Sequence, residues 1–356
     1  MRHLAFTALT GLTLLAACQQ PTEPAADLSA ARRAVRSVVI TDIGVGAHSQ
    51  AYAVSSNGLI VGSSADVVNG SGRPVIWKNG VMRYLTSSDR FGEAKGVNPS
   101  GAAVGSGAVP NLAFGATLWK DGKTIDLGVL PGGDFSQANA ITPAGQIAGS
   151  SDTSQAPGGD DGTSHAVLWQ HGVMTDLGTL GGSGSQAWAI NAAGVVVGVS
   201  HMPNNLDQHA FLWRNGTMTD LGTLPGGWAS QAYGINARGQ VVGSSNGDAA
   251  FHGHAVLWEG GAVIDLGVLP NAESSAATAI GASGDIVGWS GEGSTTPGTH
   301  AFLWRRGVMT DLGTLPGGDV SVATGINAAG EIVGFSTAAD SGPLGLVFHA
   351  VKWTVK

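Results

Sequence analysis

One stretch of this chain contains a complete structural unit and decides the fold. It runs Ser230-Gln-Ala-Tyr-Gly-Ile-Asn-Ala-Arg-Gly-Gln-Val-Val-Gly-Ser-Ser245 and then, after a loop, His254-Ala-Val-Leu-Trp258-Glu-Gly-Gly-Ala-Val-Ile-Asp-Leu-Gly267. Short apolar runs alternate here with turn residues, which predicts four strands. One turn is closed by Gly239 and the next follows Trp258. The stretch therefore predicts two successive hairpins that form a four-stranded antiparallel meander.

The same unit recurs along the chain. Seven tryptophans, each closing an apolar run, are spaced 42, 50, 44, 45, 46 and 49 residues apart: Trp77, Trp119, Trp169, Trp213, Trp258, Trp304 and Trp353. Such a period is typical of repeat proteins whose units stack to share a core. We expect the seven tryptophans to be buried in that core, at ~150–250 Å² each. An aromatic ligand platform would instead involve the irregular tryptophans Trp188, Trp228 and Trp289.

Turn chemistry supports the hairpins. Asn98-Pro99-Ser100-Gly101 places Asn, Pro and Gly where a type I turn favours them, and Asn215-Gly216 between apolar runs is a strong hairpin signal. Each unit has a second glycine four residues after the one that closes its first turn, as Gly243 follows Gly239. These second glycines are Gly62, Gly105, Gly149, Gly198, Gly243, Gly288 and Gly334. Because Gly weakens a strand interior, this series predicts a bulge or close backbone approach. The alternative is a ligand pressed against the backbone.

The two ends of the repeat region complement each other. The last copy, from about residue 321, stops at Trp353-Thr-Val-Lys356 without its Asp-Leu-Gly strand, and Val38–Gly44 supplies such a strand. Sharing one unit between the two ends closes a ring and removes an exposed edge. The sequence thus predicts an all-β fold, a seven-bladed β-propeller of four-stranded blades over residues 37–356. An open β-solenoid, the alternative, would need neither this complementation nor seven units.

The N-terminus reads as an export signal. Residues 1–17 contain Arg2, an apolar stretch from Leu4 to Leu15 and then small residues. Leu15-Ala16-Ala17-Cys18 resembles the lipobox of bacterial lipoproteins, which implies cleavage before Cys18 and a lipid on that residue; the alternative is an ordinary signal that contains a Cys. Residues 18–36 read as a flexible tether. Gln19 stands where the lipoprotein family often has a retention Asp, so the resemblance implies the outer membrane or cell surface.

Composition excludes some function classes. The chain carries a net charge of −8, and its one basic group, Arg32, Arg33 and Arg36, precedes the first strand. The repeats therefore lack the basic patch that binds phosphate backbones, and we expect no nucleic-acid partner. With 57 glycines but 43% apolar residues, the chain suits many short strands joined by tight turns rather than disorder.

The repeat motifs also carry a family resemblance. His-Ala-Phe/Val-Leu-Trp, Asp-Leu-Gly-Thr-Leu-Pro-Gly-Gly and Ile-Asn-Ala-x-Gly-x-Ile/Val-Val-Gly, over residues 116–353, resemble the HAF-type extracellular repeats of bacteria. The first two units depart from this pattern, since Val75-Ile76-Trp77 lacks the His-Ala start and Arg83-Tyr84-Leu85 replaces Asp-Leu-Gly. The resemblance implies export and repetition. It implies no catalytic residues.

Candidate chemistry is spread over the repeats. A His series and an Asp series recur, with at most one of each per unit: His165, His209, His254, His300 and His349, and Asp126, Asp176, Asp220, Asp265 and Asp311. A His–Asp pair can bind metal or act as an acid–base pair, but catalysis needs one convergent site. We therefore expect structural roles, with Asp accepting backbone N–H bonds in its turn and His making a buried hydrogen bond between strands.

No other motif indicates a cofactor, a metal site or a catalytic residue. The Leu-Pro-Gly-Gly runs at 130–133, 224–227 and 315–318 read as connectors, because no Lys-Ser/Thr and no helix follow. Residues 158–162, Gly-Gly-Asp-Asp-Gly, contain two adjacent carboxylates that can ligate calcium. These two groups supply few of the 6–8 oxygen ligands that calcium takes.

The least repeated segments are loops between the second and third strands of each unit, at residues 151–164, 201–208, 246–253, 291–299 and 337–348. Loops gather on the faces of a propeller and carry binding sites. We therefore expect a lipid-anchored, non-catalytic protein that binds a protein or glycan partner through one loop-lined face. The alternative is an extracellular polysaccharide hydrolase or lyase, which needs two converging carboxylates. Glutamate in the repeats is limited to Glu93, Glu259, Glu273, Glu292 and Glu331.

The lipid anchor makes a first prediction. Cys18→Ala removes the predicted attachment atom, so the protein should leave the membrane fraction. Cell fractionation followed by immunoblotting measures this, and unchanged membrane association would refute lipidation at Cys18.

Overall fold

The computed structural model describes residues 37–45, 47–65, 72–86, 91–109, 112–153, 164–247, 252–339 and 347–356. The predicted signal (1–17), the tether with Cys18 (18–36) and the candidate calcium loop (158–162) lie outside these residues. Across the described ranges, no helix is long and apolar enough to cross a membrane.

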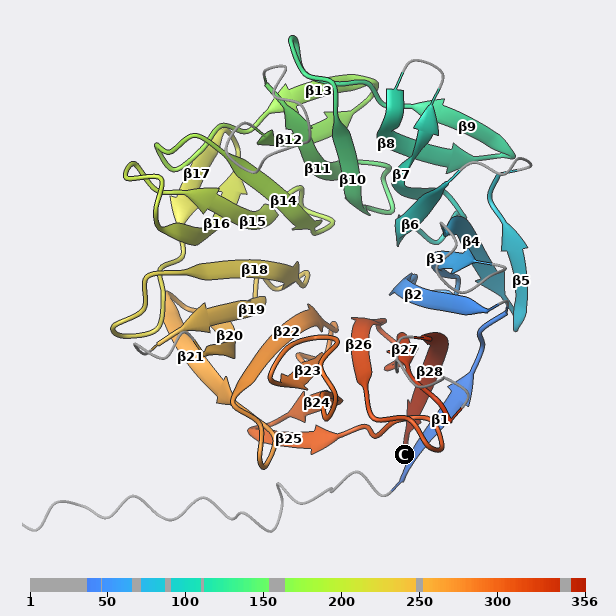
Figure 1. Cartoon of the computed structure of the whole chain (residues 1–356). Coiled ribbons are helices and arrows are strands. Elements are labelled where there is room, and N and C mark those ends of the chain that lie inside the picture. The colour runs from blue at the N-terminus through green and yellow to red at the C-terminus, as the bar shows by residue number, and fades with distance from the viewer. Residues whose placement is uncertain are drawn as a thin grey trace, which may run out of the picture. The chain divides into compact units, whose positions relative to one another are not determined.

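The described residues form seven four-stranded antiparallel sheets arranged as blades around a common axis (Figure 1). This confirms the seven-bladed β-propeller that the repeats predict. Every blade is a meander, in which each strand pairs with the next along the chain, except where the two termini meet.

Each blade has four strand positions, counted from the axis outward. The innermost strands are β2 (His48–Val54), β6 (Gly92–Val97), β10 (Ser136–Ile141), β14 (Ser185–Ile190), β18 (Ser230–Ile235), β22 (Ser274–Ile280) and β26 (Ser321–Ile326). The second strands are β3 (Ile60–Ala65), β7 (Ala103–Val109), β11 (Ile147–Asp152), β15 (Val196–His201), β19 (Val241–Asn246), β23 (Ile286–Gly291) and β27 (Ile332–Ser336). The third strands are β4 (Arg73–Lys78), β8 (Leu112–Lys120), β12 (Ser164–Gln170), β16 (Gln208–Arg214), β20 (Gly253–Glu259), β24 (His300–Arg305) and β28 (His349–Val355). The outermost strands are β5 (Val81–Tyr84), β9 (Lys123–Asp126), β13 (Val173–Asp176), β17 (Thr217–Asp220), β21 (Ala262–Gly267), β25 (Val308–Asp311) and β1 (Val38–Asp42).

The seventh blade joins the two ends of the repeat region, as the sequence predicts. Strand β1 pairs antiparallel with β28, so that Val38 lies opposite Val355 and Ile40 lies opposite Trp353. A side-chain bond, 2.9 Å from His349 Nδ1 to Asp42 Oδ2, links the same two strands. The pairing supplies the outermost strand that the last repeat lacks and closes the ring.

Every innermost strand contains a β-bulge at the same place. In β18 the pairing with β19 shifts register between Ala232 and Gly234, so that Tyr233 is the extra residue. The equivalent extra residues in blades one to seven are Tyr52, Lys95, Asn139, Trp188, Tyr233, Thr278 and Thr324. A bulge leaves its extra residue unpaired and redirects its side chain. We call these seven residues the bulge belt.

The strand glycines explain how the bulge fits. Gly243 of β19 lies opposite Ala232, the residue before the bulge. A Cβ at Gly243 would lie 1.8 Å from the carbonyl oxygen of Gln231, and the other glycines of the series give 1.9 Å to the equivalent oxygen. The close backbone approach predicted for this series is therefore confirmed, and it occurs between two strands of the same blade.

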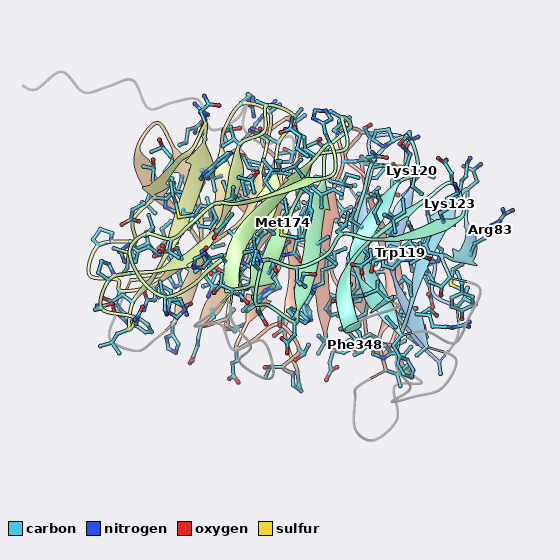
Figure 2. All side chains as sticks on the ribbon, turned by 90° about the horizontal axis from the view of Figure 1, so that it is seen from above. Arg83, Trp119, Lys120, Lys123, Met174 and Phe348 are labelled. Atoms are coloured by element: carbon cyan, nitrogen blue, oxygen red, sulfur yellow. The ribbon has the colours of Figure 1, made fainter. Side chains whose placement is uncertain are left out.

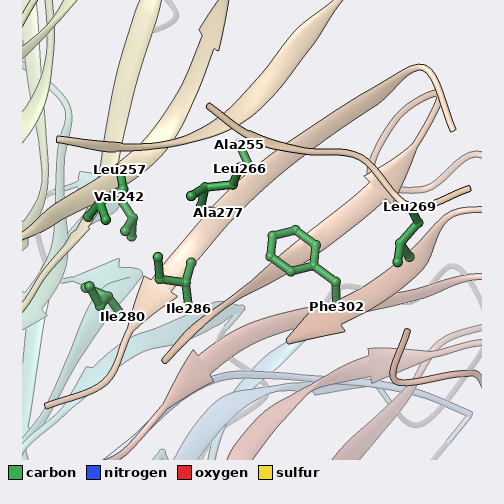
Figure 3. Close-up of a cluster of buried hydrophobic side chains, with 9 residues drawn as sticks. All are labelled: Val242, Ala255, Leu257, Leu266, Leu269, Ala277, Ile280, Ile286 and Phe302. Carbon is green, nitrogen blue, oxygen red and sulfur yellow. The ribbon is translucent and has the colours of Figure 1, made fainter. Parts of the chain in front are cut away.

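The hydrophobic core lies between neighbouring blades. One cluster joins Val242 and Leu257 of the fifth blade to Ile286 and Phe302 of the sixth (Figure 3). Five of the seven repeat tryptophans are at most 4% exposed, which confirms their predicted structural role: Trp77, Trp119, Trp169, Trp258 and Trp353. Trp213 and Trp304 are partly buried against similar clusters.

Buried serines also link adjacent blades. Ser230, the first residue of β18, accepts a bond from Ala210 N at 2.9 Å and donates to the carbonyl of Gly222 at 2.8 Å. Both partners belong to the preceding blade, and the same arrangement recurs at Ser136, Ser185, Ser275 and Ser321. One hydroxyl thus satisfies two backbone groups of the neighbouring blade, which would otherwise be buried without a hydrogen-bond partner.

The two faces of the ring differ. Because the first residue of an innermost strand pairs at or close to the end of the second strand, as Ser230 does with Ser245 of β19, the segments that follow the second strands, such as 201–208 and 291–299, lie where the innermost strands begin. We call this end the loop face. The opposite end, the turn face, carries short turns such as Asn215-Gly216, both with positive φ. In Figure 2, Lys120 and Lys123 lie toward the turn face and Phe348 toward the loop face.

The contact between glycine and bulge makes a stability prediction. Gly243→Ala forces a methyl group against backbone and should lower the free energy of unfolding by about 3 kcal/mol, the upper end of typical overpacking effects. Gly253→Ala in the same blade is the matched control, because a Cβ there meets nothing within 4 Å. Urea denaturation measures both, and equal midpoints for the two variants would contradict the proposed fit.

Candidate functional site

The bulge belt surrounds the axis of the ring. All seven belt residues line one hollow of about 440 Å³, to which every innermost strand contributes. On the turn-face side the same hollow is lined by Val54, Ile235, Ile280 and Ile326. This volume lies in the range of small-molecule binding pockets. The central channel is therefore the leading candidate site.

The belt is the most variable position of the innermost strands. The residue before it is always Ala: Ala51, Ala94, Ala138, Ala187, Ala232, Ala277 and Ala323. The residue after it is always Ala or Gly, followed by Val or Ile. Small residues on both sides permit the bulge and the close packing around the axis, whereas the belt residue ranges from Thr to Trp.

One sector of the belt is polar and charged. In β6, Lys95 Nζ lies 3.0 Å from Glu93 Oε1, and Gln137 of the next blade donates to the same oxygen at 3.2 Å. The charges of Lys95 and Glu93 thus offset each other within the channel wall. On the other side, the Tyr52 hydroxyl donates to Gln50 Oε1 at 2.6 Å.

The two belt tyrosines remain neutral well above physiological pH. Burial raises the pKa of the Tyr52 phenol, and the negative charge of Glu93 raises it further. Burial also raises the pKa of Tyr233. Each hydroxyl therefore acts as a neutral hydrogen-bonding group rather than as a base.

A second sector is aromatic. Trp188 and Tyr233, on neighbouring blades, meet edge to face with ring centroids 6.2 Å apart. Trp188 also lines a smaller hollow of about 200 Å³ whose other lining residues include Gln186, His201 and Gln231. Its indole thus separates the channel from a polar hollow at the boundary between the fourth and fifth blades.

The short belt residues link adjacent blades. Thr278 donates to Ala323 O at 2.6 Å, Thr324 to Ala51 O at 2.8 Å, and Asn139 Nδ2 to Ala187 O at 2.8 Å. Each acceptor is the alanine that precedes the next belt residue. A Thr or Asn at the belt therefore has a structural role in addition to lining the channel.

The channel has a second hollow on the loop face. About 540 Å³ is lined by residues of the fifth to seventh blades, among them Tyr233, Trp289, Phe335 and Glu292. Trp289 and Phe335 stand where other blades have Ser63, Ser106, Ser150, Val199 and Ser244. Tyr233 and Thr278 line this hollow and the belt hollow alike, so the two adjoin.

The recurrent His and Asp residues stabilise individual blades. His209 Nδ1 lies 2.8 Å from Asp220 Oδ2, and Asp220 Oδ1 accepts the Gly222 N–H at 2.7 Å. The predicted turn role of Asp is confirmed, and the described part of the chain contains five His–Asp bonds of this kind. The expected burial is wrong: the bonds join the third and outermost strands and are exposed, because the outermost strand lies at the solvated rim.

Other predicted positions divide clearly. Trp188 and Trp289 line the two hollows, whereas Trp228 lies at the surface with 42% exposure. Three of the glutamates that the enzyme alternative could use have partners elsewhere: Glu259 contacts Gln240, Glu331 contacts Lys352 and Glu273 contacts His252. Sequence reasoning missed the belt. Its signal was present as a single variable residue between Ala and Ala/Gly in each innermost strand.

Within the described residues, the channel hollow has one carboxylate in its lining, Glu93. No group of three or more His, Cys, Asp or Glu side chains in the same part of the chain is placed to hold a metal ion. The arrangement is suited to hydrogen bonding and aromatic contact with a bound molecule.

Comparisons with known proteins agree with the fold. Neither a family model nor a curated protein matches the sequence. The β-propeller domain of the Trilobed protease from Pyrococcus furiosus is similar in structure, with a TM-score of 0.51 and 9% identity over 87% of this chain and 97% of that one.

Two longer peptidase chains are also similar. A puromycin-hydrolyzing peptidase from Mycobacterium tuberculosis gives a TM-score of 0.52 and 14% identity over 75% of this chain and 44% of that chain. A prolyl endopeptidase gives a TM-score of 0.52 and 12% identity over 88% of this chain and 51% of that chain. This chain thus matches only about half the length of each peptidase. At such identities the likeness shows a β-propeller fold alone.

The buried tyrosines predict an alkaline loss of stability. Their pKa values are raised above the ordinary value of 10.0 in the folded chain, so the stability they contribute is complete below pH 10 and falls as pH rises further. The Tyr52→Phe/Tyr233→Phe double variant should show a shallower decline between pH 9 and pH 11. Melting temperatures across this range measure the effect, and parallel profiles would contradict it.

Proposed function

We propose that this protein is an exported, lipid-anchored and non-catalytic repeat protein that binds a protein or glycan partner through its loop face. It belongs, in this proposal, to the HAF-type extracellular repeats, with a lipid on Cys18 holding it at the outer membrane or cell surface. The β-propeller supplies a rigid frame, and the positions that depart from the repeat supply specificity.

The observation that carries the proposal is the aromatic hollow on the loop face. Trp289 and Phe335 replace the small residues of the other blades, and both line this hollow together with Glu292 and Ser294. Ser294 and Glu292 belong to the segment between β23 and β24, one of the variable loops, and both are exposed. Aromatic anchors beside adaptable polar loop residues are typical of binding surfaces.

The charge arrangement favours binding over polysaccharide hydrolysis. Glycoside hydrolases of the common mechanisms use two carboxylates about 5–10 Å apart. In the described part of the channel, Glu93 has Lys95 and Gln137 as partners, and a second carboxylate does not line the hollow with it. A carboxylate whose charge is offset in this way is suited to orienting a bound group.

The chain itself offers a mild variant to test this function. Trp289→Ser introduces the residue found at the same place in four other blades, so the fold should be retained while the aromatic anchor is lost. We expect at least a tenfold loss of affinity for the partner, measured with the purified full chain on an array of bacterial surface glycans. Lys123→Ala, on the turn face, is the control and should bind as the native protein does.

A protein partner is tested on intact cells. A photo-crosslinking residue at position 294 should capture a partner on the loop face, whereas one at position 123 should not. Equal binding by Trp289→Ser and the native chain, or capture from the turn face alone, would contradict the proposal. Release of reducing ends from a bound polysaccharide would favour the enzyme alternative.

A further inference from the structure

Of the buried side-chain atoms that lack a hydrogen-bond partner within the described residues, two belong to belt residues in neighbouring blades. They are Asn139 Oδ1, an acceptor, and Trp188 Nε1, a donor. Asn139 is only 7% exposed, and its amide orientation is fixed because Nδ2 donates to Ala187 O. Ala187 directly precedes Trp188, so the free acceptor lies beside the residue that carries the free donor.

Buried polar groups are normally satisfied, and exceptions call for an explanation. A hydroxyl group can accept a hydrogen bond from an indole N–H and can donate one to an amide oxygen, so hydroxyl groups have the chemistry that both atoms need. The neighbouring rings of Trp188 and Tyr233 offer apolar surface beside these polar atoms. We propose that the bulge belt binds a neutral, hydroxyl-rich sugar ring, with Asn139 and Trp188 as its specific contacts. This inference rests on the proposed binding function and assigns it a chemical class.

Charge supports a neutral ligand. The charged side chains of the belt hollow, Glu93 and Lys95, are paired at 3.0 Å. The phenols of Tyr52 and Tyr233 remain protonated, because burial raises the pKa of both. A uronic acid or an amino sugar would bring a charge into a belt hollow whose described charged side chains are already paired with each other, and it would lose its hydration on entry.

The channel has room for more than one ring. The belt hollow of about 440 Å³ adjoins the loop-face hollow of about 540 Å³ through Tyr233 and Thr278. Trp188 also has the smaller hollow behind it, which gives the indole space to adjust when a ligand reaches its N–H. Side-chain adjustments of this kind are common on binding. The end of a glycan chain can thus enter from the loop face and reach the belt.

A peptide fits this wall less well. An extended peptide binds a sheet by pairing with an exposed strand edge. All seven innermost strands are interrupted by a bulge at the belt, and bulges turn an edge away from such pairing. The polar side chains of the belt are therefore better placed for hydroxyl groups than for a peptide backbone.

The experiment uses the purified full chain in a detergent that contains no sugar. Saturation-transfer NMR and titration calorimetry are carried out with the methyl glycosides of glucose, galactose, mannose and N-acetylglucosamine, and with maltose and cellobiose. Glucuronic acid, glucosamine and the tripeptide Gly-Ala-Gly are the comparison probes. We expect at least one neutral sugar to bind at one site per chain, and the three comparison probes not to bind.

The decisive variant keeps the structural bond and removes the amide oxygen. Asn139→Thr places at this position the residue that links adjacent blades at Thr278 and Thr324. It should melt as the native protein does and bind the sugar about tenfold more weakly, the loss of one hydrogen bond. Trp188→Phe, which keeps an aromatic ring without the N–H, should weaken binding to a similar degree.

Several results would overturn the inference. It is wrong if no neutral sugar binds, if both variants bind as tightly as the native chain, or if a charged sugar or the tripeptide binds instead. If Asn139→Thr does not fold, Trp188→Phe decides the question alone. The proposed function is tested separately by Trp289→Ser. If the belt variants lose sugar binding while Trp289→Ser binds the partner as tightly as the native chain, the sugar site in the belt is supported and partner binding at the loop face is refuted.

Discussion

The contact between a strand glycine and a bulged neighbour underlies the whole ring. In each blade the second strand has Gly where a methyl group would lie within 2 Å of a carbonyl oxygen of the innermost strand. That absence of a side chain lets the innermost strand carry an extra residue without separating from its neighbour. Seven repetitions of the contact bring seven bulges to the axis. The same local geometry thus builds the scaffold and creates the belt.

The bulge also separates two demands on the sequence. Residues on either side of it are small and constant, because they pack against the second strand and the adjacent blade. The bulge residue makes no ladder bond, so its side chain is freer to vary. Where it is short, as at Thr278 and Thr324, it links blades. Where it is large, as at Trp188, it shapes the channel. The residue at the bulge can therefore differ from blade to blade without a change of fold.

The sequence is sufficient for the architecture. Periodic tryptophans, Asn-Gly turns and the strand at Val38–Gly44 are local signals, and each of them corresponds to an observed feature. The belt was harder to recognise, because a bulge breaks the alternation by which strand faces are assigned, and Ala-Tyr-Gly-Ile reads as ordinary strand. Which side chains meet is also non-local: Asn139 and Trp188 become neighbours only when blades stack. The exposed His–Asp bonds were misjudged for a related reason, since the spacing of residues does not show which strand lies at the rim.

The pairing of β1 with β28 has a consequence for how the chain reaches its folded state. Ile40 cannot pair with Trp353 until nearly the entire repeat region has been synthesised. Contacts between distant segments form slowly, because the entropy of closing so long a loop must first be overcome. Six blades can assemble in chain order, each on the one before it, but the seventh needs both ends. The first strand of the domain to be synthesised is thus the last to be paired, and the ring is completed only when the last strand is available.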